Sequence, residues 1–318
     1  MTALQSLPEP EVIERFACFG GSCQVAVEGR GPAGAAAEAA QRARRRLEHW
    51  HHQFSRFEPE SELALLNADP RETVPVSPVM ARFIDAAMSV AEITGGLVDP
   101  TLVGDLERAG YRESFSTEPA QVVEFLELAP VRAAAAPNPE ARWRTIHLDR
   151  SKNVVTRPPG LRLDSGGIAK GLFGDILASV LGGHRSFAVD AAGDVRLGGT
   201  PGSPRPVQVA SPFDDSILHS FEAGHGAVAT SGISKRSWLD GDGRPGHHLL
   251  DPATGRPAFT GLLQVTAFAS SGVEAEALSK AALLSGPEGA RPWLVRGGLI
   301  VRDDGSFEVF PLPAAEPR

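Results

Sequence analysis

The stretch LDSGGIAKGLFGD, residues 163–175, joins a β-prone run that ends in Asp164, a pair of glycines and the start of a helix. Backbone amides at a helix N-terminus can hold a phosphate or pyrophosphate, and Lys170 could add its charge. A plain glycine turn between a strand and a helix fits the same letters. The stretch alone therefore predicts a strand-turn-helix unit, and an anion site only if other segments support one.

Two better known glycine motifs do not match this stretch. A P-loop lysine has a different glycine spacing and is followed by Ser or Thr, whereas Lys170 is followed by Gly171. The letters DSGG also occur around the nucleophile of chymotrypsin-like proteases, but the His and Asp motifs of that family do not accompany them. We therefore expect neither a P-loop nucleotide site nor a serine protease.

Short β-prone runs alternate with glycine turns and two helices downstream of this stretch. The runs are 187–189, 207–209, 263–268 and 299–301. One helix is expected over 168–181, before Gly182 and Gly183, and another over 273–284, before Gly286. This mixture predicts an α+β fold.

Two helices are also expected upstream. Residues 23–27 have strand character, 29–34 make a turn, and a helix follows at about 35–54. A second helix begins near Ser77 and Pro78, with Ser as its cap, and stops at Gly95.

The expected organisation is one domain with two short tails. We expect a polar N-terminal tail at 1–15, a domain at 16–310 and a C-terminal tail at 311–318. The segment 133–140, rich in Ala and Pro, is the best candidate for an internal boundary or insertion.

Composition excludes several classes of protein. The net charge of −8 argues against a nucleic-acid partner, which requires concentrated Lys and Arg. Cys18 and Cys23 lack partners at metal-ligand spacing, so neither a zinc site nor a disulfide framework is expected. No stretch is apolar enough to span a bilayer, and residues 1–16 have no basic and apolar signal regions. We therefore expect no membrane insertion, and a cytoplasmic location.

Two groups of histidines could carry chemistry. His247 and His248 precede Asp251 and a tight turn, and an imidazole near hydroxyl groups suits general acid-base catalysis. A loop histidine bonded to backbone is the commoner alternative. His49, His51 and His52 have no carboxylate at ligand spacing and are expected at the surface.

Eight segments, in order along the chain, resemble the ApbE family. They are FGG (19–21), FSRFEPESELALLN (54–67), TGGLVDPTL (94–102), LDSGGIAKGLFGD (163–175), DAAGDVRLGG (190–199), ATSG (229–232), HHLLDPATGRP (247–257) and EAEALSKAALLSGPE (274–288). The resemblance covers roughly residues 16–300, and eight ordered motifs are far more specific than any one of them.

The resemblance implies both a fold and an activity. Members of the family have an α+β architecture related to the T-fold, with a mixed, largely antiparallel sheet and flanking helices. They bind FAD in a cleft between sheet and helices, transfer its FMN half to a Thr or Ser of a target protein, and release AMP. We therefore expect FAD, an unidentified acceptor protein and FMN transfer. FAD hydrolysis, with water as the acceptor, fits the same residues.

The resemblance also implies a set of site residues. Those expected to bind the cofactor are Phe19, Phe57, Leu97, Val98, Asp99, Asp164, Lys170 and Leu249. His248 is the candidate base. A magnesium ion would be held by the carbonyl of Gly167 and by the later helix, through Glu276 and Ser279, since this ion prefers oxygen ligands.

The chain departs from the family at the metal motif. The usual A-D-A-L-[AS]-T appears as AEALSK, so that Glu276 replaces Asp and Lys280 replaces Thr. A carboxylate can still bind a metal, but an ammonium has no lone pair and would repel a cation. An ordinary i to i+4 ion pair is the other interpretation. The alternative function is an FAD-binding protein for flavin storage, delivery or sensing, with Lys280 in place of magnesium.

Two aromatic positions also differ from the family. The usual Met-Gly-Thr appears as Phe19-Gly20-Gly21, and the usual Tyr of FS-x-Y appears as Phe57. Both phenyl rings keep an apolar contact for an isoalloxazine, while Phe57 lacks the hydroxyl donor.

Overall fold

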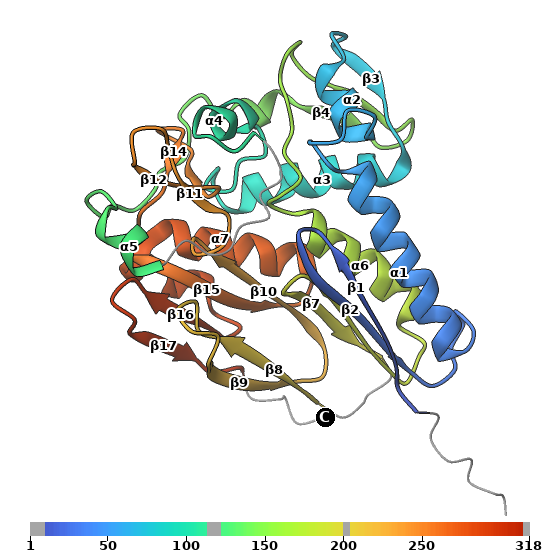
Figure 1. Ribbon diagram of the computed structural model, residues 1–318. Coiled ribbons are helices and arrows are strands. Elements are labelled where there is room, and N and C mark those ends of the chain that lie inside the picture. Colours follow the sequence, from blue (N-terminus) through green and yellow to red (C-terminus); the bar gives the residue numbers. More distant parts are fainter. Residues whose placement is uncertain (1–9, 113–121, 200–203, 314–318) are drawn as a thin grey trace, which may run out of the picture.

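An eight-stranded sheet forms the centre of the computed structural model, which describes residues 10–112, 122–199 and 204–313 (Figure 1). The strands, in their order across the sheet, are β1 (Val12–Cys18), β2 (Gly21–Glu28), β6 (Ser186–Ala191), β7 (Asp194–Gly198), β10 (Gly226–Gly232), β15 (Leu262–Ala269), β16 (Gly298–Arg302) and β17 (Phe307–Phe310). Every neighbouring pair is antiparallel. The expected α+β class with a largely antiparallel sheet is confirmed.

Three long helices cover one face of this sheet (Figure 1). They are α1 (Ala36–Gln53), α6 (Ala169–Leu181) and α7 (Gly272–Gly289), and α3 (Pro78–Ile93) packs against α6 and α7. The remaining helical segments are α2 (Glu62–Ala68), α4 (Val103–Arg108), α5 (Val122–Glu127) and the 3₁₀ turns η1 (Arg142–Thr145) and η2 (Arg291–Trp293). Among the described residues, none of the helices combines the length and the apolar character that a bilayer span requires.

Local signals fix the ends of these helices. Ser77 caps α3 by accepting a hydrogen bond from the amide of Met80, and Pro78 occupies the first turn. Ser271 caps α7 in the same way. The backbone of α7 leaves the helical conformation at Gly286, where φ is 73°, and Pro287 follows. These are the start of α3 and the end of α7 that the sequence predicts.

A separate hairpin covers the other face of the sheet. Its strands are β8 (Arg205–Ala210) and β9 (Ile217–Ala223). In β10 the alternation of a strand turns Val228 toward the hairpin residue Phe221, while Ala229 packs under α7. The small sheets are β3 (Thr73–Pro75), β5 (Val154–Thr156) and β4 (His147–Asp149); β11 (Ser237–Leu239) with β12 (Pro245–His247); and β13 (Leu250–Asp251) with β14 (Arg256–Pro257).

The N-terminal boundary differs from the one expected. Residues 12–15, which the sequence assigns to a polar tail, form the first half of β1. This strand lies at the edge of the sheet and exposes every second side chain, so its polar residues are compatible with pairing. Residues 1–9 and 314–318, which belong to the two expected tails, lie outside the described residues.

The segment 133–140, expected as an internal boundary or insertion, forms backbone hydrogen bonds with two other segments of the chain. The amide of Ala133 donates to the carbonyl of Phe259, and the amide of Ala135 donates to the carbonyl of Leu284. The boundary itself stays a prediction.

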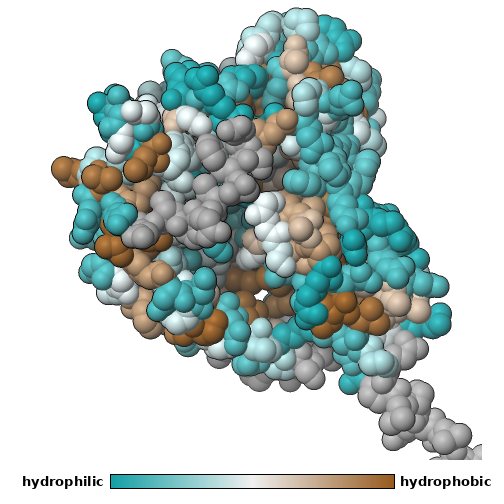
Figure 2. Space-filling view, viewed as in Figure 1, coloured by the Kyte–Doolittle hydropathy of each residue, from teal (hydrophilic) through white to brown (hydrophobic). Residues whose placement is uncertain are grey.

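The visible surface is largely hydrophilic over α1, α3 and α4, while hydrophobic side chains gather near α5 at the left edge (Figure 2). Val123, Leu128 and Val131 are the large exposed hydrophobic residues of that region.

The starts of α6 and α7 touch backbone to backbone at Gly171 and Gly272. A methyl group at either glycine would overlap the carbonyl group of the other. This close approach lets the amide of Gly171 donate to Glu276 Oε2 at 2.8 Å. The absence of two side chains therefore fixes the distance between the helices.

Gly171→Ala should lower the free energy of unfolding by about 1–3 kcal/mol, because the added methyl group meets backbone that cannot rotate away. The control is Gly104→Ala in α4, whose added methyl group would meet only the flexible ends of Arg108 and Arg162. That control should change stability by less than about 1 kcal/mol. Urea denaturation of both variants is the measurement, and equal stabilities would contradict the proposed contact.

Candidate functional site

A cavity of about 340 Å³ lies where α6, α7 and the loops around residues 54–58, 97–99 and 248–250 meet. This volume falls within the range of small-molecule sites. Eleven residues named from the sequence line it: Phe19, Phe57, Leu97, Val98, Asp99, Asp164, Gly167, Lys170, His248, Leu249 and Lys280. Glu276 and Ser279 do not line the cavity. Their side chains are fully buried behind it.

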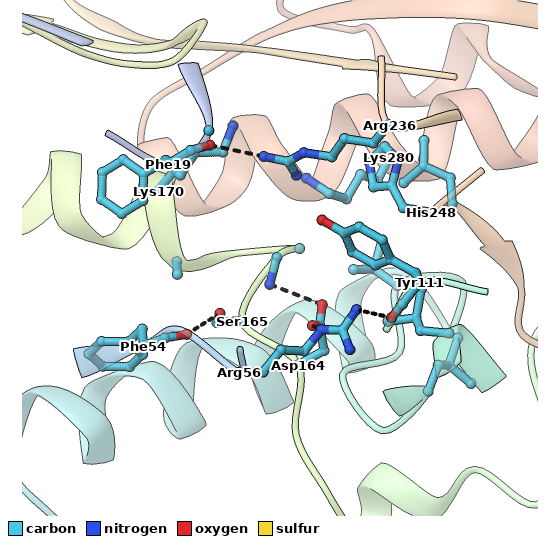
Figure 3. A pocket seen from close by; sticks show the side chains of 18 of the residues that line it. Phe19, Phe54, Arg56, Tyr111, Asp164, Ser165, Lys170, Arg236, His248 and Lys280 are labelled. Atoms are coloured by element: carbon cyan, nitrogen blue, oxygen red, sulfur yellow. Dashed lines mark hydrogen bonds and ion pairs between the residues drawn. The ribbon is translucent and has the colours of Figure 1, made fainter. Parts of the chain in front are cut away.

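Three cations stand along one wall of the cavity (Figure 3). Arg236 Nη2 donates to the carbonyl of Phe19 at 3.1 Å, and Lys170 Nζ lies 2.5 Å from Asp194 Oδ2. Lys280 Nζ lies 3.3 Å from Glu276 Oε1. The side chains of Lys170 and Lys280 are 17% and 12% exposed, so their charges are poorly screened by solvent.

The pKa values of the carboxylates behind this wall are shifted by the same charges. Burial raises the pKa of Glu276, against the opposing effect of Lys280. Burial also acts to raise the pKa of Asp194, but Lys170 and Lys280 offset it and the pKa is lowered. For Lys170 burial acts to lower the pKa, while Asp194 and Glu276 raise it above its ordinary value. Lys170 is therefore charged at neutral pH.

An arginine that the sequence analysis missed organises the opposite wall. Arg56 Nε lies 3.2 Å from Asp164 Oδ1, and Nη2 donates to the carbonyl of Tyr111 at 2.8 Å. Asp164 Oδ2 accepts from the amide of Gly166 at 3.0 Å. The carboxylate of Asp164 thus has a partner on each oxygen. Arg56 belongs to segment 54–67, one of the eight that resemble the ApbE family. Its place in that segment was the sign that it could belong to the site.

Tyr111 contributes an aromatic surface between the two walls. Its ring stacks on Trp238 at 5.8 Å between centroids and meets Phe57 edge-on at 5.5 Å. Burial raises the pKa of the Tyr111 hydroxyl, which points toward the wall that carries Arg236 and Lys280 (Figure 3). It is the single tyrosine of the chain. The ring of Tyr111 thus lies against Phe57, the position where this chain lacks the hydroxyl of the usual Tyr.

Asp99 lines the cavity and has one unsatisfied carboxyl oxygen. Oδ1 accepts from the amide and the hydroxyl of Thr101, at 2.8 and 2.6 Å. Oδ2 is buried and has no hydrogen-bond partner in the described part of the chain. Burial raises the pKa of this carboxyl. A buried orphan oxygen in a cavity is satisfied by a ligand that donates a hydrogen bond.

The two adjacent histidines have different surroundings. His248 lines the cavity, and its Nδ1 has no partner among the residues described. Burial, and then the charge of Arg236, lower the pKa of His248 well below its ordinary value, so the ring is neutral at pH 7. His247 points away from the cavity and packs edge-on against Phe259. His51, expected at the surface, also lines the cavity, because its ring packs edge-on against Phe19.

A family model described as the ApbE family matches residues 19–301. The chain belongs to the ApbE family. It is 28% identical over 314 residues to a Rhodobacter capsulatus FAD:protein FMN transferase, covering 96% of this chain and 58% of that protein. A Vibrio cholerae protein of the same name is 27% identical over 285 residues, which cover 86% of this chain and 82% of that protein. The structure of the ApbE protein of Thermotoga maritima superimposes on this one with a TM-score of 0.76 at 27% identity. The match covers 95% of this chain and 97% of that one.

The metal position of this ApbE-family chain does not offer an open set of oxygens. Glu276 uses Oε2 for the amide of Gly171 and Oε1 for Lys280. The Ser279 hydroxyl bonds to that of Ser231 at 2.8 Å. A methyl group at Gly167 would lie 3.9 Å from Cε of Lys280, so the lysine reaches the glycine turn.

No group of three His, Cys, Asp or Glu residues suited to a metal occurs among the residues described. Because Glu276 and Ser279 are bonded to protein groups and Lys280 lies beside Glu276, these donors do not fit a magnesium ion.

The burial of His247 makes stability depend on pH. Burial lowers its pKa to about 3, whereas the unfolded imidazole titrates near its ordinary value of about 6.5. The unfolded chain therefore takes up this proton first, and the stability contributed by His247 is present above about pH 6.5 and lost as the pH falls toward 3. Each pH unit in that window costs about 1.4 kcal/mol.

His247→Asn should remove about 2 kcal/mol of the stability that the wild type loses between pH 6.5 and 5. In the wild type, Nδ1 of His247 accepts a hydrogen bond from the amide of Leu249. The side-chain oxygen of Asn keeps an acceptor for that amide. Guanidinium denaturation at several pH values gives the loss for each protein. The exposed His49→Asn is the control and should keep the wild-type slope, and an unchanged slope in His247→Asn would refute the assignment.

Proposed function

We propose that this protein is an FAD:protein FMN transferase that attaches FMN to a Thr or Ser hydroxyl of an acceptor protein. The observation that carries the proposal is the meeting of a cationic wall and a neutral imidazole in one cavity. Lys170, Arg236 and Lys280 suit a diphosphate, while the neutral ring of His248 suits a hydroxyl proton. Membership in the ApbE family and the names of the relatives support the same activity.

In the proposed reaction the acceptor oxygen bonds to the phosphorus of the FMN half. The bond from that phosphorus to the bridging oxygen breaks, and AMP leaves with that oxygen. The ring of His248 takes the proton of the acceptor hydroxyl, because a hydrogen bond to the backbone of Arg236 holds the ring and burial keeps it neutral. Lys280 and Arg236 stabilise the negative charge that develops on the leaving phosphate.

The other groups of the cavity bind and orient the dinucleotide. Asp99 offers its buried Oδ2 to a donor of the ligand, and the rings of Phe57 and Tyr111 form an apolar surface for a flat ring system. Arg56 holds Asp164 in place and leaves the glycine turn open. Magnesium, when bound in a related site, would supply charge to the diphosphate, but no step here depends on it.

A binding protein without transfer activity is the second candidate. The observation in its favour is the pairing of Glu276 with Lys280, which occupies the position expected for a metal. Such a protein would hold FAD for storage, delivery or sensing. FAD hydrolysis differs only in using water in place of the acceptor hydroxyl.

The test uses the purified protein, FAD and soluble protein from the source organism as acceptor. AMP release is followed by chromatography, and flavin fluorescence is followed in a denaturing gel. Transfer predicts AMP together with a fluorescent band, hydrolysis predicts AMP alone, and binding predicts neither product.

His248→Ala should lower the rate of AMP release at least 100-fold, since general base catalysis contributes about 10²–10⁴. FAD affinity, measured by calorimetry, should stay within tenfold of the wild type, because a base acts in the reaction and does not hold the ligand. The exposed His49→Ala is the control and should keep both properties. Unchanged turnover in His248→Ala would exclude the base.

A further inference from the structure

We propose that Lys280 is the resident cation of the diphosphate site, so that the protein binds FAD without a divalent metal. This inference rests on the proposed function for the identity of the ligand. It goes beyond that function by stating which side chain carries the charge and by making the site independent of metal.

The position of Lys280 is the first argument. It lies on α7 with its side chain 12% exposed, and it lines the cavity. Its Cε approaches Gly167, in the turn that precedes α6. A long side chain that stays nearly buried while reaching a glycine turn is not placed there by solvation, because lysine is normally exposed. Its ammonium is thus held beside the backbone that a phosphate would approach.

The hydrogen bonds of Lys280 are the second argument. An ammonium has three donors and no acceptor, and Glu276 Oε1 takes one of them at 3.3 Å. Glu276 is fully buried and is fixed by its bond to the amide of Gly171. The carboxylate therefore anchors the ammonium and leaves its other donors for a ligand in the cavity, which Lys280 lines.

The balance of charge is the third argument. The wall has three cations, Lys170, Arg236 and Lys280, against the two carboxylates of Asp194 and Glu276. The three cations line the cavity, whereas the two carboxylates lie behind them, so the surface that a diphosphate would meet is positive. A divalent ion at the same place would stand next to the ammonium and would be repelled by it.

A metal would also disturb the contact between the two helices. Each oxygen of Glu276 already accepts a hydrogen bond, so an ion there would compete with Lys280 at Oε1 or with the Gly171 amide at Oε2. Displacement of the amide would remove a bond at the point where α6 and α7 touch. The arrangement of donors therefore suits an ammonium in the position of a metal.

The experiment measures FAD and riboflavin affinity by titration calorimetry, with either EDTA or magnesium chloride present. Riboflavin has the flavin ring but no phosphate. Wild-type protein should bind FAD with the same affinity, within threefold, in both buffers. Lys280→Met should weaken FAD binding at least tenfold and leave riboflavin binding within threefold, because it keeps the length of the side chain and removes its charge.

Two further variants complete the design. Lys280→Arg should recover part of the FAD affinity, since it restores a cation. Lys152→Met removes a lysine whose side chain is 75% exposed and should change neither affinity. Thermal unfolding of each variant checks its fold, and the comparison of buffers uses wild-type protein alone, so it holds even if Lys280→Met does not fold.

The outcomes separate the inference from the proposed function. A wild-type protein that binds no flavin would refute the function. FAD binding that requires magnesium would leave the function standing and overturn the inference. So would a Lys280→Met variant with wild-type FAD affinity, or one that loses riboflavin and FAD to the same extent.

Discussion

The hydrogen bond from the amide of Gly171 to Glu276 is the interaction on which the site depends. It forms because Gly171 and Gly272 let α6 and α7 meet without side chains between them. A buried carboxylate would otherwise be too costly to retain in charged form. Once Glu276 is held there, Lys280 follows one helical turn later and reaches into the cavity. Helix packing, buried charge and ligand chemistry thus depend on one contact.

The charged groups of the cavity form two walls that differ in net charge. On one wall Arg56 and Asp164 neutralise each other. On the other, cations exceed carboxylates. A dinucleotide with a diphosphate between two ring systems fits such a site, because its charge can face one wall while its rings contact aromatic surface. Tyr111 gives that surface between the walls, and its hydroxyl lies within the cavity (Figure 3). Of the positions where this chain departs from its family, Lys280 lines the wall on which cations are in excess.

The sequence predicts features that depend on a few neighbouring residues, such as helix ends. It does not predict features that depend on how distant segments pack. Ser77 and Gly286 mark the ends of α3 and α7 because caps and left-handed glycines act within a few residues. β1 was missed because an edge strand tolerates polar side chains. In the site, motif residues such as Asp99 reach the cavity, whereas Arg236 comes from the loop between β10 and β11 and lies outside the quoted motifs. Nor could sequence show whether Lys280 faces solvent or the cavity.

A crystal structure of the protein with FAD, grown in the presence of manganese and measured at an anomalous wavelength, tests the central claim most directly. The account predicts the ammonium of Lys280 within hydrogen-bonding distance of the diphosphate, Glu276 still bound to the amide of Gly171, and no anomalous peak between them. A manganese peak bridging Glu276 and the diphosphate, with Lys280 turned away, would contradict it.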